Sequence, residues 1–429
     1  MKVEVELISK QVIKPSSPTP NHLRHYKLSL LDQLTPQLNN SMVYFYAHES
    51  MSITDDPSNH LKKSLSQALS YYYPLAGRHV DNTFVECNDE GVPYLEAKVS
   101  YCKLNDVLEN PIPSEVSKLL PFAMDEIVDT LLGVQLNVFD CGGIAIGICM
   151  SHKIGDALSF FGFIQSWTTI ARGEARDHEG IKTRFISATL FPPRDMSWYD
   201  PNKIIPKDEN IVSKRFVFDA TVIDALKAKY EDMMALQKTP SRVEVLSTFI
   251  WTRFMATTQV ASKGHRSYVV AHTVNLRSRM DPPLPAYAFG NYYRAATMFP
   301  LLDYKGECCD LVRNLRVEIK KIDNDYILKL QEGIEYLNSL REDFKRLAKN
   351  EEKEIVPFTF TALCRFPVYD ADFGWGKPTW VGPPAWKVKN VAIFIDTKLG
   401  GGIEAYISMT EEDMVEFQND KELLAHISK

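Results

Sequence analysis

Apolar and polar residues alternate with two different periods along this chain of 429 residues, and these periods predict both strands and helices. Residues 58–72 carry an apolar residue at every third or fourth position, which predicts an amphipathic helix. Residues 143–150 (GIAIGICM) are almost wholly apolar and predict a buried strand, and helical spacing returns over 156–172. The N-terminal residues alternate apolar with charged positions, which is typical of an edge strand.

The second half of the chain shows the same mixture of periods. Residues 241–256 have helical spacing, and Ser241 with Glu244 three positions later matches a capping box at the start of that helix. The apolar runs 267–276 and 391–396 predict strands, and the glycines at 400–402 predict a hairpin turn. Residues 310–349 are charged and predict a helix. Because helices and strands interleave in both halves, we predict an α/β protein.

A Pro- and Asp-rich stretch divides the chain. A single hydrophobic core stops growing well below this length, so two domains are expected. Residues 176–211 contain the segment LFPPRDMSWYDPNKIIPKDEN, whose prolines disfavour regular elements. We therefore predict a first domain over 1–175, a linker over 176–211 and a second domain over 212–429.

Composition and charge exclude several classes of protein. Hydrophobic residues make up 45% of the chain and charged residues 24%, a normal globular balance. The net charge of −6, without a basic stripe, argues against a nucleic-acid partner. Neither a signal peptide nor an apolar run of membrane-spanning length is visible, so a cytoplasmic protein without membrane contact is expected. The seven cysteines lack CxxC spacing, which favours reduced thiols and no metal site.

The densest chemical signal is SHKIGDALSF, where His152 follows the predicted buried strand and Asp156 opens the next helix. Imidazole titrates near neutral pH, so His152 is a candidate general base. Spacing alone also allows a hydrogen-bonded core histidine and an Asp156 that only caps its helix. A zinc site lacks further ligands nearby, and the GxSxG, GxGxxG and P-loop motifs are absent.

Several motifs together resemble those of the plant BAHD acyltransferases. They are HKIGD at 152–156, DFGWG at 372–376, YPLAGR at 73–78, NLRSR at 275–279 and FGN at 289–291. The HKIGDALSF pattern and the overall sequence are most similar to alkaloid O-acetyltransferases of that family. The resemblance implies two chloramphenicol-acetyltransferase-like domains with a solvent channel between them, and a monomeric protein. A segment near 365–390 is then expected to complete the N-terminal domain.

The resemblance also implies roles at the reaction centre. His152 removes the proton of the acceptor hydroxyl, which attacks the thioester without a covalent acyl-enzyme. Asp156 has an orienting, structural role and pairs with Arg277 of the NLR segment. Trp375 and Asn291 are candidate donors of a hydrogen bond to the oxyanion.

The remaining implied roles concern the DFGWG segment and the donor. Asp372, Gly374 and Gly376 are expected to be structural, because glycines permit the tight bend. Ser241 and Arg242, at the start of a predicted helix, are expected to contact coenzyme A, since a helix N-terminus suits a phosphate.

The expected co-substrate is acetyl-CoA, with no metal, and the expected acceptor is a small hydrophobic alcohol such as an indole alkaloid. Phe160 stands where malonyl-transferring relatives can carry an arginine, which favours acetyl, although Arg294 keeps malonyl transfer open. Aromatic acyl donors and amide formation also stay open. A non-catalytic binding protein on the same fold is disfavoured, because His152 and the DFGWG segment are both intact.

Overall fold

A computed structural model of the chain describes residues 2–50, 56–175, 181, 183–204, 210–234, 239–261, 266–298, 308–338, 341–342 and 354–428. Parts of the predicted linker and of the charged segment 310–349 lie outside these ranges. No helix within them is long and apolar enough to cross a bilayer.

The chain forms two compact units, each built on a six-stranded sheet, which confirms the predicted α/β class. The first unit comprises Met1–Ile205, Leu284–Tyr292 and Phe366–Ala385, and the second comprises Pro206–Pro283, Tyr293–Arg365 and Trp386–Lys429. Much of the predicted linker belongs to the first unit, where Phe191 is fully buried. The apolar side chains of Phe191 and Met196 in this stretch therefore pack like core residues.

The sheet of the first unit is mixed, with the strand order β1-β6-β7-β8-β3-β13. Its strands are β1 (Glu4–Ile13), β6 (Val92–Ser100), β7 (Leu132–Phe139), β8 (Ile144–Ser151), β3 (Asn39–Tyr46) and β13 (Trp380–Gly382). β1 is an edge strand, as its alternating pattern predicts. β8 lies between β7 and β3, and its residues are buried up to Met150. A strand covered on both faces has no exposed positions, which explains its continuous apolar run.

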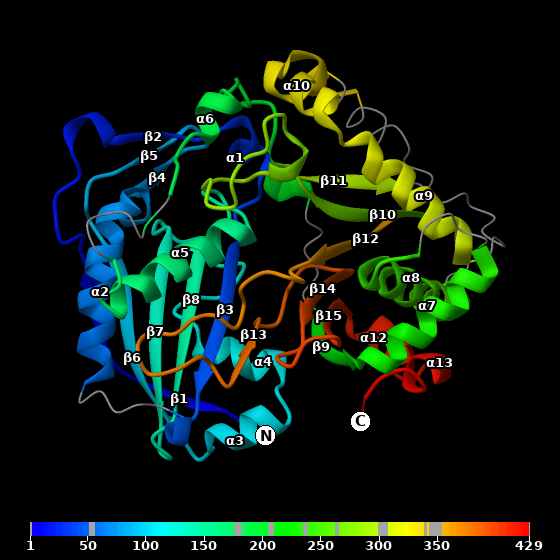
Figure 1. Cartoon of the computed structure of the whole chain (residues 1–429), viewed down its shortest axis with the longest axis horizontal. Helices are drawn as coiled ribbons and strands as arrows, with labels where there is room; N and C mark the ends of the chain where they lie inside the picture. Colours follow the sequence, from blue (N-terminus) through cyan, green and yellow to red (C-terminus); the bar gives the residue numbers. More distant parts are fainter. Residues whose placement is uncertain are drawn as a thin grey trace. The chain divides into compact units, whose positions relative to one another are not determined.

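The first unit also contains helices. They are α1 (Leu30–Leu34), α2 (Pro57–Tyr71), α3 (Leu104–Glu109), α4 (Pro113–Val116), α5 (Ala157–Ala171) and α6 (Ser187–Leu190), and a small sheet holds β2 (His25–Lys27), β5 (Phe84–Glu86) and β4 (Arg78–Val80). α2 and α5 lie side by side over one face (Figure 1). Between them, Trp167 Nε1 donates to Ser64 Oγ at 3.0 Å. A side chain at Gly147 would meet the carbonyl of Leu119, so the strand backbone approaches residues 117–120 closely.

The second unit has the strand order β11-β10-β12-β14-β15-β9. These strands are β11 (Tyr293–Met298), β10 (Arg266–Asn275), β12 (Glu354–Ala362), β14 (Val391–Asp396), β15 (Ile403–Thr410) and β9 (Ile211–Phe218). Its helices are α7 (Ala220–Met234), α8 (Arg242–Ala261), α9 (Cys308–Lys321), α10 (Asn324–Glu332), α12 (Glu411–Gln418) and α13 (Lys421–Leu424) (Figure 1). Trp251 and Phe254 of α8 pack against Phe358 of β12 in the core of this unit.

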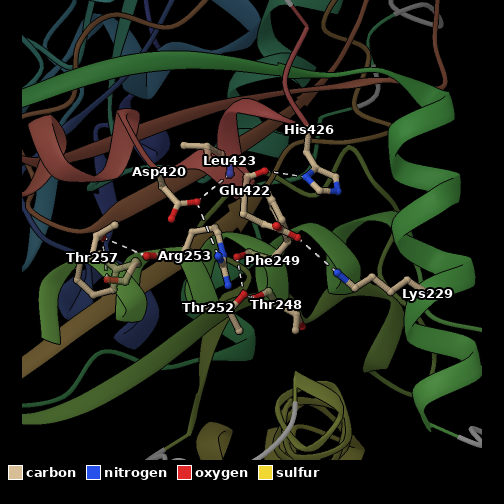
Figure 2. A network of polar contacts seen from close by, with 11 residues as sticks. Lys229, Thr248, Phe249, Thr252, Arg253, Thr257, Asp420, Glu422, Leu423 and His426 are labelled. Carbon is tan, nitrogen blue, oxygen red and sulfur yellow. Dashed lines mark hydrogen bonds and ion pairs between the residues drawn. The ribbon is translucent and has the colours of Figure 1, made fainter. Parts of the chain in front are cut away.

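Polar contacts fasten the C-terminal turn of this unit to α8, as Figure 2 shows. The carboxylate of Asp420 accepts a hydrogen bond from the backbone of Leu423 at 2.8 Å and lies 3.8 Å from the guanidinium of Arg253. His426 Nδ1 donates to the carbonyl of Glu422 at 2.7 Å. These contacts stabilise the second unit.

Candidate active site

His152 follows the buried end of β8. Ser151, the last residue of that strand, pairs with Asn39 of β3, and the backbone N–H of His152 donates to the carbonyl of Leu38 at 2.7 Å. The strand pairing therefore continues by one residue and fixes where the imidazole leaves the sheet. The residue as a whole is partly exposed.

Asn291 holds the imidazole from the segment 284–292 of the same unit. Its Oδ1 lies 3.0 Å from His152 Nδ1. Its Nδ2 lies 2.7 Å from the carbonyl oxygen of His152 and 2.8 Å from Asp32 Oδ1, and both of these oxygens can only accept. The amide orientation is thereby assigned, and Oδ1 must accept from a protonated Nδ1. In the neutral ring, Nε2 is then the unprotonated nitrogen that can act as a base.

These contacts give Asn291 a role other than the one expected from sequence. Both hydrogens of its amide nitrogen already point at acceptors, namely the carbonyl of His152 and the carboxylate of Asp32. An oxyanion donor needs an N–H aimed at the substrate oxygen. Asn291 therefore holds the imidazole of His152, and both of its amide hydrogens already have acceptors other than a substrate oxygen.

Burial lowers the pKa of His152 below its ordinary value of 6.5. The charge of Asp156 and the hydrogen bond to Asn291 act in the opposite direction, and Lys153 adds to the lowering. The imidazole is therefore neutral at neutral pH, which is the state that a general base requires.

The pH dependence of kcat/KM reports this pKa in the free enzyme. A protonated His152 cannot accept a proton, so activity falls as the pH drops through the pKa of the folded protein. Because that pKa is lowered, we expect the acidic limb of the profile to have its midpoint below 6.5. A midpoint above that value would contradict the assignment of His152 as a base desolvated by its surroundings.

Asp156 faces backbone groups. Its Oδ1 accepts from the backbone N–H of Ser159 at 2.9 Å and caps α5, and its Oδ2 accepts from the backbone N–H of Tyr292 at 3.0 Å. The carboxylate thus joins the helix after the histidine to the residue after Asn291. This geometry supports the structural role expected for Asp156. Arg277 is buried in the second unit, and its ion pair with Asp156 stays a prediction.

The segment around Asn291 is held by its backbone. Ser159 Oγ donates to the carbonyl of Gly290 at 2.9 Å and accepts from its N–H at 3.0 Å. Gly290 has a φ of 143°, and a Cβ there would meet Cβ of Ser187 at 2.8 Å. Both the conformation and the lack of space require glycine.

The DFGWG segment forms a tight turn closed by Asp372. Its Oδ1 accepts from the backbone N–H groups of Gly374 at 2.8 Å and Gly376 at 2.9 Å, and both glycines have positive φ values. Arg172, at the end of α5, donates to the carbonyl of Asp372 at 2.5 Å. The structural roles proposed for Asp372 and the two glycines agree with this geometry.

The structure does not bring Trp375 to His152. The indole is 1% exposed and packs edge-on against Tyr46, with 5.9 Å between the ring centroids. Tyr46 pairs with Ile144 at one end of β8, whereas His152 follows the other end. Seven strand residues span roughly 23 Å. The indole N–H finds no acceptor among the described residues, but this distance makes it unsuitable as the oxyanion donor.

The two residues expected to contact coenzyme A lie at the start of α8 in the second unit. Ser241 Oγ accepts from the backbone N–H of Glu244 at 3.2 Å, and the backbone N–H of Ser241 donates to the Glu244 carboxylate at 2.7 Å. The predicted capping box is confirmed. Arg242 forms an ion pair with Asp396 at 2.8 Å.

A cavity of about 970 Å³ lies beside this helix start, within the second unit. Its lining includes Ser241 and four basic residues, Arg279, Arg313, Arg316 and Lys320. Arg316 is neutralised in part by Glu244, at 2.6 Å. Arg313 and Lys320 are exposed and seven residues apart on α9, so they share one face of that helix. Their helical spacing is visible in the sequence, but only the fold places them beside Ser241.

Comparisons with known proteins agree on the family of the chain. The profile of the Transferase family matches residues 3–424. Stemmadenine O-acetyltransferase of Catharanthus roseus is 38% identical over 98% of this chain and 97% of its own length. Vinorine synthase of Rauvolfia serpentina is 38% identical over 96% of both chains, and a limonoid 21-O-acetyltransferase of Citrus sinensis is 36% identical over 99% of both.

Solved structures show the same fold. The crystal structure of vinorine synthase matches with a TM-score of 0.83 at 35% identity, covering 99% of both chains. That of TRI101 from F. sporotrichioides, complexed with coenzyme A and T-2, matches with a TM-score of 0.75 at 17% identity, covering 94% of this chain and 99% of the other.

Proposed function

Since this chain belongs to the Transferase (BAHD) family of acyltransferases, we propose that it transfers an acetyl group from acetyl-CoA to a hydroxyl of a plant specialised metabolite such as an indole alkaloid. The observation that carries the mechanism is the hydrogen bond from His152 Nδ1 to Asn291 Oδ1. It presents Nε2 of a neutral imidazole as the base.

The reaction proceeds by direct transfer in a ternary complex. Nε2 of His152 takes the hydroxyl proton while the acceptor oxygen attacks the thioester carbonyl. The new C–O bond forms, the C–S bond breaks, and the proton on His152 passes to the departing CoA thiolate. A positioned base contributes about 10²–10⁴-fold in rate, and holding both substrates together contributes further.

The cationic cavity beside α8 is the proposed site of the CoA phosphates. Ser241, Arg313 and Lys320 present a hydroxyl and two exposed cations to this one cavity. Phosphate is stabilised both by such cations and by a helix N-terminus. Arg242 is engaged with Asp396, so we assign it to the support of this helix start.

The acyl group is proposed to be acetyl. Phe160 is 1% exposed and packs against Phe161 in the first unit. The guanidinium of Arg294, the cation that left malonyl transfer open, lies 5.1 Å from the centre of the Tyr336 ring and hydrogen-bonds the hydroxyl of that tyrosine. The guanidinium of Arg294 therefore already interacts with Tyr336 in the second unit, which favours acetyl over malonyl as the acyl group.

The names of the relatives guide the choice of acceptors. Two of them carry the names of alkaloid-forming enzymes, and others are named as limonoid O-acetyltransferases at similar identity. An assay should therefore offer labelled acetyl-, malonyl- and benzoyl-CoA with indole alkaloid alcohols, limonoid alcohols and matched amines. We expect acetyl esters by mass spectrometry, with release of one CoA thiol for each ester. Preferred malonyl or benzoyl transfer, or amides as the main products, would overturn the proposal.

A further inference from the structure

Asp32 is a fully buried carboxylate on α1 that belongs to the same network as His152. Its Oδ2 accepts from the backbone N–H of Ser29 at 2.8 Å and from Ser29 Oγ at 2.7 Å. Its Oδ1 accepts from Asn291 Nδ2 at 2.8 Å and from the backbone N–H of Asn291 at 3.2 Å. Four donors therefore converge on the two oxygens.

The donors favour the ionised carboxylate. Each of the two oxygens already receives two hydrogens, so a proton on either one would displace a donor. Burial raises the pKa of Asp32, and the hydrogen bonds from Ser29 and Asn291 oppose that rise. The side-chain amide of Asn291 thus connects the buried negative charge of Asp32 to the imidazole of His152.

Lys153 ties α1 to the histidine from the other side. Its ammonium group is buried and donates to the carbonyl oxygens of Asp32 at 2.9 Å, Thr35 at 2.7 Å and Gln33 at 3.3 Å. The residue after the base therefore caps the end of the helix that carries Asp32. Both attachments fix α1 relative to His152.

We infer that Asp32 is a positioning residue for the general base, acting through Asn291. The carboxylate holds the amide of Asn291 so that Oδ1 meets His152 Nδ1, and its charge polarises that amide toward a more negative Oδ1. The imidazolium that forms during transfer is then stabilised, while the carboxylate touches neither substrate. The expected effect of Asp32 on the rate of acetyl transfer rests on the proposed function. Its expected effect on the titration of the His152 imidazole rests on the geometry alone.

Asp32→Asn removes the charge at nearly constant volume. Asp156 and Lys153, whose charges shift the pKa of His152, stay in place. We expect a loss in kcat of roughly ten- to a hundredfold, the scale of a slightly misplaced catalytic group, with the KM for acetyl-CoA unchanged. We also expect the titration midpoint of the His152 ring, followed by NMR without substrates, to move to lower pH.

A matched control removes another buried carboxylate. Glu404→Gln in the second unit breaks the ion pair with Arg215, and it should lower stability without moving the His152 midpoint. If Asp32→Asn does not fold, Asn291→Ala removes the whole link, including its own hydrogen bond to His152, and should lower the midpoint by at least as much. An unchanged His152 midpoint in the folded variant would overturn the inference. Absence of acetyl transfer by the wild-type protein would overturn the proposed function instead, because the NMR titration needs no turnover.

Discussion

Replacing His152 with alanine is expected to leave the fold intact and to reduce kcat by about 10²–10⁴-fold, the contribution of a positioned general base. The residue is partly exposed and follows the end of a strand, so the loss of its side chain leaves the sheet itself unchanged. Acetyl transfer should be measured under saturating acetyl-CoA, alongside circular dichroism of the variant. His426→Ala is a suitable control, because His426 lies in the second unit, where it contacts the carbonyl of Glu422 and the ring of Phe249.

Rescue by added imidazole separates a chemical role of His152 from a structural one. The truncated side chain leaves space at a partly exposed position, where a free imidazole can replace the missing base. We expect added imidazole to restore part of the lost activity, more at a pH where it is neutral. Near-normal turnover of His152→Ala without imidazole would remove the mechanism.

Asp156→Ala is expected to lower both stability and activity. The change removes the cap of α5, worth about 1 kcal/mol, and leaves the buried N–H of Tyr292 without its acceptor, which costs about 1–3 kcal/mol. A loss of roughly 2–4 kcal/mol in the free energy of unfolding follows. Activity should fall as well, because Tyr292 neighbours Asn291, which hydrogen-bonds the imidazole of His152.

Asp56→Ala provides the matched comparison for this loss. Asp56 caps α2 in the same way, accepting from the backbone N–H of Asn59 at 2.9 Å, but it is exposed and has no second backbone donor like Tyr292 in its hydrogen bonds with described residues. Urea denaturation of both variants should therefore show the smaller loss for Asp56→Ala. Equal losses would mean that the bond from Tyr292 to Asp156 contributes nothing beyond the helix cap.

Local patterns in the sequence predicted the elements that carry the site. The apolar run before His152 is the central strand β8, Asp156 is the cap of α5, and Ser241 with Glu244 forms the capping box of α8. The glycines at 400 and 401 have positive φ values in the turn between β14 and β15, as expected. Each of these features depends on neighbours within a few residues, so periodicity and turn chemistry suffice to find it.

The contacts around the imidazole could not be found in that way. Asn291 meets His152 across 139 positions of the sequence, and Asp32 meets Asn291 across 259. Neither pair leaves a periodic signal, because long-range hydrogen bonds depend on how the sheet and its loops are arranged. The FGN motif drew attention to Asn291, but motif and residue type alone suggested an oxyanion donor, whereas the structure shows Asn291 hydrogen-bonded to His152 and Asp32.

The most direct test of the account concerns the proton on the His152 ring. Nitrogen NMR of histidine-labelled protein at neutral pH, with the signal assigned by comparison with His152→Ala, distinguishes the two tautomers. The account predicts a neutral ring protonated at Nδ1, with Nε2 unprotonated. A ring protonated at Nε2 at that pH would contradict it.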